Sequence, residues 1–72
     1  MRKFKITQDC IAKKMISYPS YTDTYGIIRK SFKKGDILQY EKTQLIDYSF
    51  YVIAKDSSGN CFLFNPFEGE IY

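Results

Sequence analysis

The sequence predicts an all-β fold, a small five- to six-stranded barrel with at most one short helical turn, which fills residues 1–72 as one domain. The chain has only 72 residues but contains seven Tyr and six Phe, whose large side chains suit a small core. Its apolar runs are short and are separated by turn-forming residues, as in sheet proteins. Ser31–Tyr40 and Tyr48–Ala54 form the central predicted strand pair, and the first run contains a tight turn at Gly35.

The first half of the chain contains three predicted strands and one long polar connection. Arg2–Thr7 alternates apolar and polar residues, which is typical of a half-buried strand. Asp9–Ser17 fits either a helical face or a strand. We interpret it as a strand, because it is short for an independent helix and its neighbours resemble strands. Ser17–Gly26 contains Pro19 and many turn formers, so it is expected to be a loop, and Gly26–Phe32 is the next strand.

In the second half, one polar link and one strongly apolar strand set the pattern. Glu41–Asp47 is predicted to be the link, with Leu45 and Ile46 returning to the core. Tyr48–Ala54 is apolar on both faces, as a central strand would be. A hairpin turn, a returning strand, a break at Pro66 and a short closing edge strand complete the chain, at Lys55–Asn60, Cys61–Phe64, Asn65–Phe67 and Glu70–Tyr72.

Charge is distributed unevenly along the chain, although its net value is only +3. Residues 1–34 hold nine Lys or Arg and two Asp, a net charge of +7. Residues 35–72 hold two Lys and six acidic residues, a net charge of −4. This split indicates either a basic face for an acidic partner or two halves that attract each other across a barrel surface. We favour the second, because halves of a sequence need not become halves of a barrel.

The chain is expected to be cytoplasmic. Its first residues lack the apolar run of a secretory signal, and no stretch approaches the ~18 apolar residues of a membrane helix. Cys10 and Cys61 are therefore expected to be reduced thiols, and a disulfide between an early and a late strand is the alternative.

The predicted elements follow a familiar order along nearly the whole chain. An early strand precedes a Pro loop at Tyr18–Ser20, and a strand ending in Lys33–Gly35 leads through an extended run to a Gly hairpin at Asp56–Asn60. In order and spacing this resembles bacterial Src-homology-3-like domains, and the resemblance implies a barrel of that kind. Two features depart from it. Such domains often carry a Gly-Trp pair in a late strand, where this chain has Cys61 and Phe62, and the Pro loop is longer.

Residue types needed for common catalytic sites are missing, so the chain is predicted not to be an enzyme and to need no cofactor or metal. It has no His, which removes the usual general base and imidazole ligands. Two cysteines far apart in sequence do not make a zinc site, and no glycine-rich phosphate loop precedes a helix. The acidic pair Glu68 and Glu70 is interpreted as solvated.

A protein- or peptide-binding module is the leading functional hypothesis, because a Tyr can bury its ring and keep its hydroxyl in water. A short chain of this kind would fit a phage or mobile-element inhibitor or adaptor that acts on a host protein. The predicted contact residues are the tyrosines of the long loop and of the central strands: Tyr18, Tyr21, Tyr25, Tyr40, Tyr48 and Tyr51.

Two alternatives stay open. Small barrels bind nucleic acid with aromatic and basic residues, so nucleic-acid binding is the first alternative. The second is a homo-oligomeric structural component, whose copies pair through Arg2–Thr7 or Glu70–Tyr72. The predicted nucleic-acid contacts are three basic pairs: Lys13 and Lys14, Arg29 and Lys30, Lys33 and Lys34.

Overall fold

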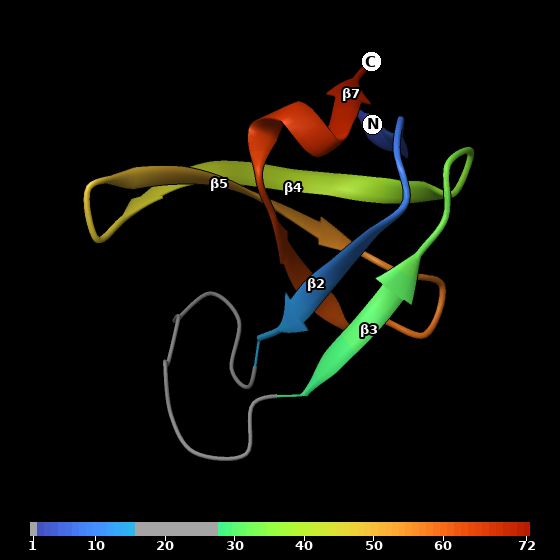
Figure 1. Cartoon of the computed structure of the whole chain (residues 1–72), viewed down its shortest axis with the longest axis horizontal. Coiled ribbons are helices and arrows are strands. Elements are labelled where there is room, and N and C mark those ends of the chain that lie inside the picture. The colour runs from blue at the N-terminus through green and yellow to red at the C-terminus, as the bar shows by residue number, and fades with distance from the viewer. Residues whose placement is uncertain (1, 16–27) are drawn as a thin grey trace.

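The computed structural model describes residues 2–15 and 28–72, which form one antiparallel sheet and a single turn of 3-10 helix (Figure 1). Seven strands lie in this part of the chain. They are β1 Lys3–Ile6, β2 Cys10–Lys14, β3 Arg29–Phe32, β4 Ile37–Ile46, β5 Ser49–Lys55, β6 Cys61–Phe64 and β7 Gly69–Ile71, and the 3-10 turn η1 is Pro66–Glu68.

The all-β prediction is confirmed, but the sheet does not close. Its strand order is β3-β2-β6-β5-β4-β1-β7, and every neighbouring pair is antiparallel. The outermost strands, β3 and β7, are not paired with each other. The described residues also hold seven strands rather than five or six. Two strands were expected at edges of the sheet, Arg2–Thr7 and Glu70–Tyr72. The second expectation is met by β7, but the first is wrong, because β1 lies between β4 and β7.

Both glycine turns predicted from the sequence are present. In Lys33–Asp36 the Asp36 amide donates to the Lys33 carbonyl at 3.0 Å, and Gly35 has φ of +100°. This turn is also tied to β1, because the Gly35 amide donates to the Ile6 carbonyl at 2.8 Å. The second turn joins β5 to β6, with Gly59 at φ of +89°.

The ambiguous segment before the long loop is a strand where the structure describes it. Cys10–Lys14 pairs with β3 on one side and with β6 on the other. Ala12 is buried and Ile11 is exposed, as alternation in a strand requires. Residues 16–27, which include Tyr18, Tyr21 and Tyr25, lie outside the described residues.

The predicted polar link after Tyr40 is wrong. Residues 41–46 continue β4, which pairs with β5 as far as Ile46 opposite Ser49. The pairing register shifts between Tyr40 and Lys42, so Glu41 occupies a β-bulge. Pairing with β5 overrides the weak strand preference of the polar residues in this segment.

Two apolar clusters lie on opposite faces of the central strands. Phe62 and Phe64 of β6 point into the larger cluster, whereas Cys61 and Leu63 point into the smaller one, so the whole strand is buried. Aromatic rings dominate the larger cluster, where the Phe32 ring centroid lies 5.0 Å from that of Phe62 and 5.1 Å from that of Phe64. The larger cluster consists of Phe4, Ile6, Ala12, Phe32, Leu38, Val52, Ala54, Phe62 and Phe64, and the smaller of Met15, Ile53, Cys61 and Leu63.

A membrane-spanning helix is not found: within residues 2–15 and 28–72, no helix has the length and apolar character that crossing would require.

Candidate functional site

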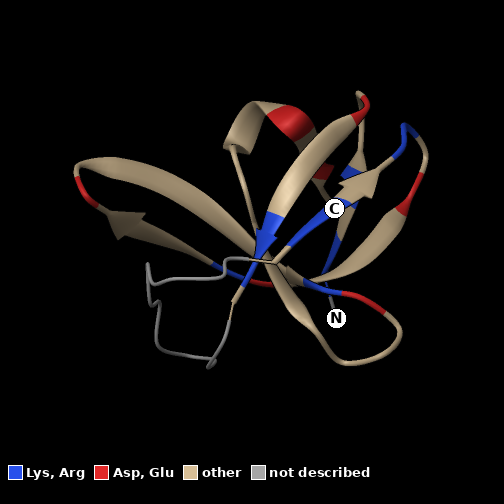
Figure 2. Cartoon of the chain, turned by 60° about the horizontal axis from the view of Figure 1, so that its bottom comes forward, with Lys and Arg blue, Asp and Glu red and all other residues tan. Residues whose placement is uncertain are grey.

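The β4–β5 hairpin reaches beyond the rest of the sheet. Figure 1 shows it as a long arm, and Figure 2 shows that its outer part carries no charged residue except an acidic one at the tip. On β5 the buried residues are Val52, Ile53 and Ala54, at the base of the arm. The bulge at Glu41 lies on the partner strand near this base. Because bulges bend a strand, the arm can diverge from the curved sheet at this position.

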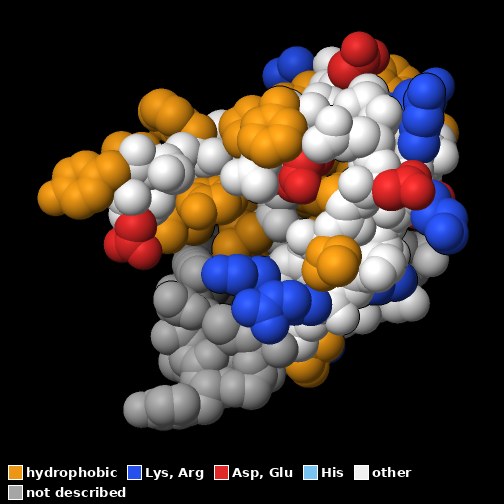
Figure 3. Space-filling view, in the orientation of Figure 1, with side chains coloured by type: hydrophobic (Ala, Val, Ile, Leu, Met, Phe, Trp, Pro, Cys, Tyr) orange, Lys and Arg blue, Asp and Glu red, His pale blue; other side chains and the backbone are white. Residues whose placement is uncertain are grey.

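Large apolar side chains are exposed at the end of this arm. Leu45 is 57% exposed, Phe50 is 61% exposed and Tyr48 is fully exposed. Leu45 and Phe50 are directly paired across the two strands, so their side chains share one face. Figure 3 shows the resulting apolar group on the projecting arm. We refer to Leu45, Tyr48 and Phe50 as the hairpin tip.

Other exposed apolar side chains are more dispersed. Ile11 lies on β2, Ile37 at the start of β4 and Phe67 in η1. The hairpin tip is distinctive because three such side chains fall within six consecutive residues of one projecting element. Isolated exposed apolar residues are normal on protein surfaces, whereas clusters mark interaction sites.

The turn at the end of the arm has an unfavourable backbone for its sequence. Its two central residues, Asp47 and Tyr48, both have positive φ, of 48° and 67°. This is the geometry of a two-residue type I′ turn, in which the second position strongly prefers Gly. Asp tolerates the left-handed region, but a bulky residue such as Tyr is an outlier there, at a cost of roughly 1 kcal/mol or more. Tyr48 is therefore both strained and fully exposed.

The six predicted tyrosines do not form one surface in the part of the chain that is described. Tyr40 packs against the larger cluster, and its hydroxyl is 2.8 Å from Thr43 Oγ1. Tyr51 is half-buried against the smaller cluster, on the opposite face of the sheet. Tyr48 was expected to begin a strand and instead lies in the turn. Of these three, only Tyr48 is fully exposed.

The six predicted nucleic-acid contacts occupy three different places. Lys13 and Arg29 are paired across β2 and β3 and are both exposed. Lys30 lies on the opposite face, with its Nζ 5.4 Å from the Phe32 ring centroid and 3.5 Å from Asp56 Oδ2, and Lys14 shares that face. Beyond the other end of β3 lie Lys33 and Lys34, in the turn before β4. The structure therefore brings only pairs of these cations together.

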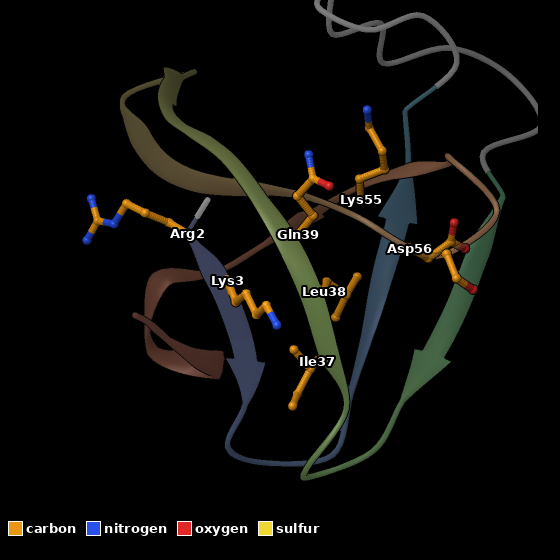
Figure 4. Close-up of a pocket in the computed structure, with 8 residues that line it drawn as sticks. Arg2, Lys3, Ile37, Leu38, Gln39, Lys55 and Asp56 are labelled. Carbon is orange, nitrogen blue, oxygen red and sulfur yellow. The ribbon is translucent and has the colours of Figure 1, made fainter.

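A shallow groove of about 280 Å³ lies beside β1 and β4, lined in part by Arg2, Lys3 and Lys55 (Figure 4). The cations do not converge in it, because Arg2 extends away from Lys55. Two polar side chains of the groove, Gln39 and Lys55, already interact with Glu41. Its Oε2 accepts a hydrogen bond from Gln39 Nε2 at 2.8 Å and lies 3.9 Å from Lys55 Nζ. The groove offers no preorganised set of donors for a ligand.

Neither cysteine is an activated nucleophile. Burial raises the pKa of the Cys61 thiol, with Glu41 and Asp56 adding to the rise and Lys55 opposing it. Burial also raises the pKa of Cys10, helped by Glu68 and two aspartates. Both are free thiols. Glu68 has a structural contact, since its Oε1 accepts from the Asn65 amide at 2.8 Å. No metal-ligating cluster of three or more side chains occurs within the described ranges.

Comparison with known proteins adds no relative. No family model matches the chain, and neither the curated proteins nor the solved structures contain a match.

Sequence reasoning identified Tyr48 but missed Leu45 and Phe50. Leu45 was expected to return to the core, and Phe50 was placed on a buried strand face. The available signal was Leu-Ile-Asp-Tyr-Ser-Phe-Tyr, in which apolar residues flank Asp47 and Tyr48 on both sides. Without the Gly or Asn that usually marks a two-residue turn, the hairpin was not recognised.

Proposed function

We propose that this chain is a non-enzymatic protein-binding module that inserts its hairpin tip into an apolar pocket of another protein. One observation carries the proposal: Tyr48 is fully exposed although its backbone conformation would favour Gly. A fully exposed side chain that is held at a free-energy cost calls for a role outside its own molecule.

The residues next to Tyr48 in the hairpin support this function. Leu45 and Phe50 lie on one face of the same two strands and would widen the contact. On the other face, Ile46 and Tyr51 pack against the smaller cluster and hold the arm to the sheet. Aromatic side chains on a rigid element are frequent hot spots in protein interfaces. Asp47, exposed beside Tyr48, favours a pocket with a basic or hydrogen-bond-donating rim.

The proposal includes a finer description of the fold. We regard the curved sheet as an open relative of the small Src-homology-3-like barrel, enlarged by the β4–β5 arm. Its supports are the order of strands and turns and the contact of the Lys33–Asp36 turn with β1. A scaffold of this kind, with the larger cluster at its centre, would hold the arm rigidly. An inhibitor or adaptor of a host protein would use such an arm.

Nucleic-acid binding is supported less well by the geometry. Aromatic platforms next to basic residues are required for single strands, and the exposed hairpin tip has no Lys or Arg within it. The paired cations Lys13 and Arg29 lie on β2 and β3, and β6 separates these strands from the β4–β5 arm.

A site-specific photocrosslink tests the proposal. A photoreactive phenylalanine analogue replaces Tyr48 in one variant and exposed Ser58, in the other β5 turn, in a matched control. We expect a discrete crosslinked protein from the native cell at position 48 and none at position 58. With that protein purified, Tyr48→Ala should weaken binding by at least about tenfold, as loss of an aromatic hot spot does. Equal crosslinking at both positions, or unchanged affinity of Tyr48→Ala, would refute the proposal.

A further inference from the structure

The strand β3 forms one edge of the sheet among the described residues. This strand is last in the strand order and pairs only with β2 in the part of the chain that is described (Figure 1). The Lys14 amide donates to the Ile28 carbonyl at 2.7 Å, which fixes the hydrogen-bonding phase of the pair. Because antiparallel pairs alternate between bonded and non-bonded positions, the amide and carbonyl groups of Arg29 and Ser31 point away from β2. These groups can hydrogen-bond to an added strand.

Basic side chains lie next to this edge. Lys13 and Arg29 occupy directly opposite positions on β2 and β3, and like charges in such positions repel each other. Within residues 2–15 and 28–72, the ion pairs Lys30–Asp56 and Lys55–Glu41 involve neither Lys13 nor Arg29, and neither of these two cations is neutralised by an ion pair there. Figure 3 shows blue side chains gathered over the β2 region of the sheet.

Nearby acidic groups offset this charge only in part. The Asp9 and Asp36 carboxylates are held at the far end of β3, where they accept the Lys34 amide at 2.8 Å and the Lys33 amide at 2.9 Å. Glu68 lines the small groove that Lys13 also borders. Lys30 is the one cation of β3 that has an acidic partner, Asp56, in the described structure.

We propose that the free edge of β3 takes up an extended acidic segment of a protein as an additional strand. Its backbone would bond to Arg29 and Ser31, and its acidic side chains, at every second position, would lie on the face of Lys13 and Arg29. This relieves the repulsion between the two cations. The site is separate from the hairpin tip and does not depend on it, because β6 lies between β2 and the β4–β5 arm that carries the tip.

Amide exchange measured by NMR tests the backbone part of the proposal. The probe is a short synthetic peptide of alternating Glu and Val residues. In the free protein the Arg29 and Ser31 amides should exchange quickly, whereas the Lys30 and Phe32 amides are protected by β2. The peptide should slow exchange at Arg29 and Ser31 by about tenfold or more and leave the other two unchanged. Absence of this alternating protection would overturn the proposal.

Variants and altered peptides test the chemistry. The double substitution Lys13→Glu and Arg29→Glu should weaken peptide binding by at least about tenfold, whereas the equally charged control Lys3→Glu and Lys5→Glu, on β1, should change it little. Thermal unfolding shows that each variant is folded. A peptide with Lys in place of Glu, or one N-methylated at alternate positions, should not bind. Equal binding of the Glu and Lys peptides would overturn the proposal.

Two further measurements separate this site from other partners. A single-stranded oligonucleotide that protects Arg29 and Ser31 better than the acidic peptide would assign the edge to nucleic acid and overturn the proposal. Tyr48→Ala should bind the acidic peptide as tightly as the wild type. A loss of peptide binding in Tyr48→Ala would show that the hairpin tip is the peptide site and would equally overturn it.

Discussion

The turn before β5, at Asp47 and Tyr48, and the turn after it, from Asp56 to Asn60, differ in how their backbones are supported. In the second turn Gly59 takes the left-handed conformation, and Asp56 Oδ1 accepts the Ser58 and Asn60 amides at 3.0 and 2.9 Å. In the first turn a Tyr takes that conformation, at full exposure. Left-handed backbone therefore stabilises the second turn, whereas in the first turn it presents a side chain to solvent at a cost in stability.

Removing the Asp56 carboxylate should have the largest effect on stability. Asp56→Ala leaves two turn amides without their acceptor and breaks the contact with Lys30 Nζ. Hydrogen bonds to a charged acceptor contribute about 1.5–3 kcal/mol, so a loss of about 2 kcal/mol of unfolding free energy is expected in urea denaturation. Ser57→Ala, in the same turn, is the control and should change little. Equal stability of both variants would contradict this account of the turn.

The Asp56 contribution should also depend on pH. Burial alone would raise the pKa of this carboxyl, but hydrogen bonds from the Asn60 and Ser58 amides and from Lys30 outweigh it and lower the pKa below the ordinary value. The folded state therefore holds the proton less tightly than the unfolded chain. The stabilisation is complete above the unfolded pKa and is lost as pH falls through the lowered folded pKa.

Urea midpoints of the wild type and Asp56→Ala, compared from neutral pH downward, measure this dependence. The difference between the two proteins should be constant near pH 7 and should shrink in the acid range. A difference that persists unchanged at the lowest pH at which both proteins fold would show that the ionised carboxylate is not its source.

The two turns also show what could be predicted from the sequence. Gly59 and Gly35 mark their turns with a residue that tolerates positive φ, so the sequence predicts both turns. Asp47 and Tyr48 give no such signal, because the turn there uses a residue that disfavours its conformation. The polar residues of Glu41–Asp47 predict a link, and only pairing with β5 makes residues 41–46 part of a strand.

Surface assignments failed for a related physical reason. Alternation identifies the two faces of a strand, and Phe50 does share a face with buried Val52. Whether a face is covered depends on how far the sheet extends over it, which is a property of distant strands. Phe50 lies beyond the larger cluster and is exposed. The open edges at β3 and β7 likewise follow from non-local pairing, so local patterns predict strands but not closure.

Substitution of Gly59 should have a moderate effect. No atom lies within 4 Å of a Cβ built at this position, so the cost of Gly59→Ala comes from the backbone alone, with φ at +89°. About 1 kcal/mol of destabilisation is expected, measured by urea denaturation. Gly59→Asn should be less destabilising, because Asn tolerates the left-handed region better. If Ala and Asn have the same effect, backbone strain is not the cause.

Substitution of Tyr48 should have the smallest effect on stability, and Tyr48→Gly should stabilise the fold, in contrast to the destabilising substitutions above. Tyr48→Ala removes a fully exposed ring but retains a Cβ, so the unfolding free energy should stay close to the wild-type value. Tyr48→Gly removes the left-handed strain as well and should be more stable than Tyr48→Ala by about 0.5–1 kcal/mol, even though Gly is more flexible in the unfolded chain. Both variants lack the ring and should lose partner binding to the same extent. A Gly variant less stable than the Ala variant would show that the turn is not strained, and Tyr48 would lose its distinction from an ordinary exposed residue.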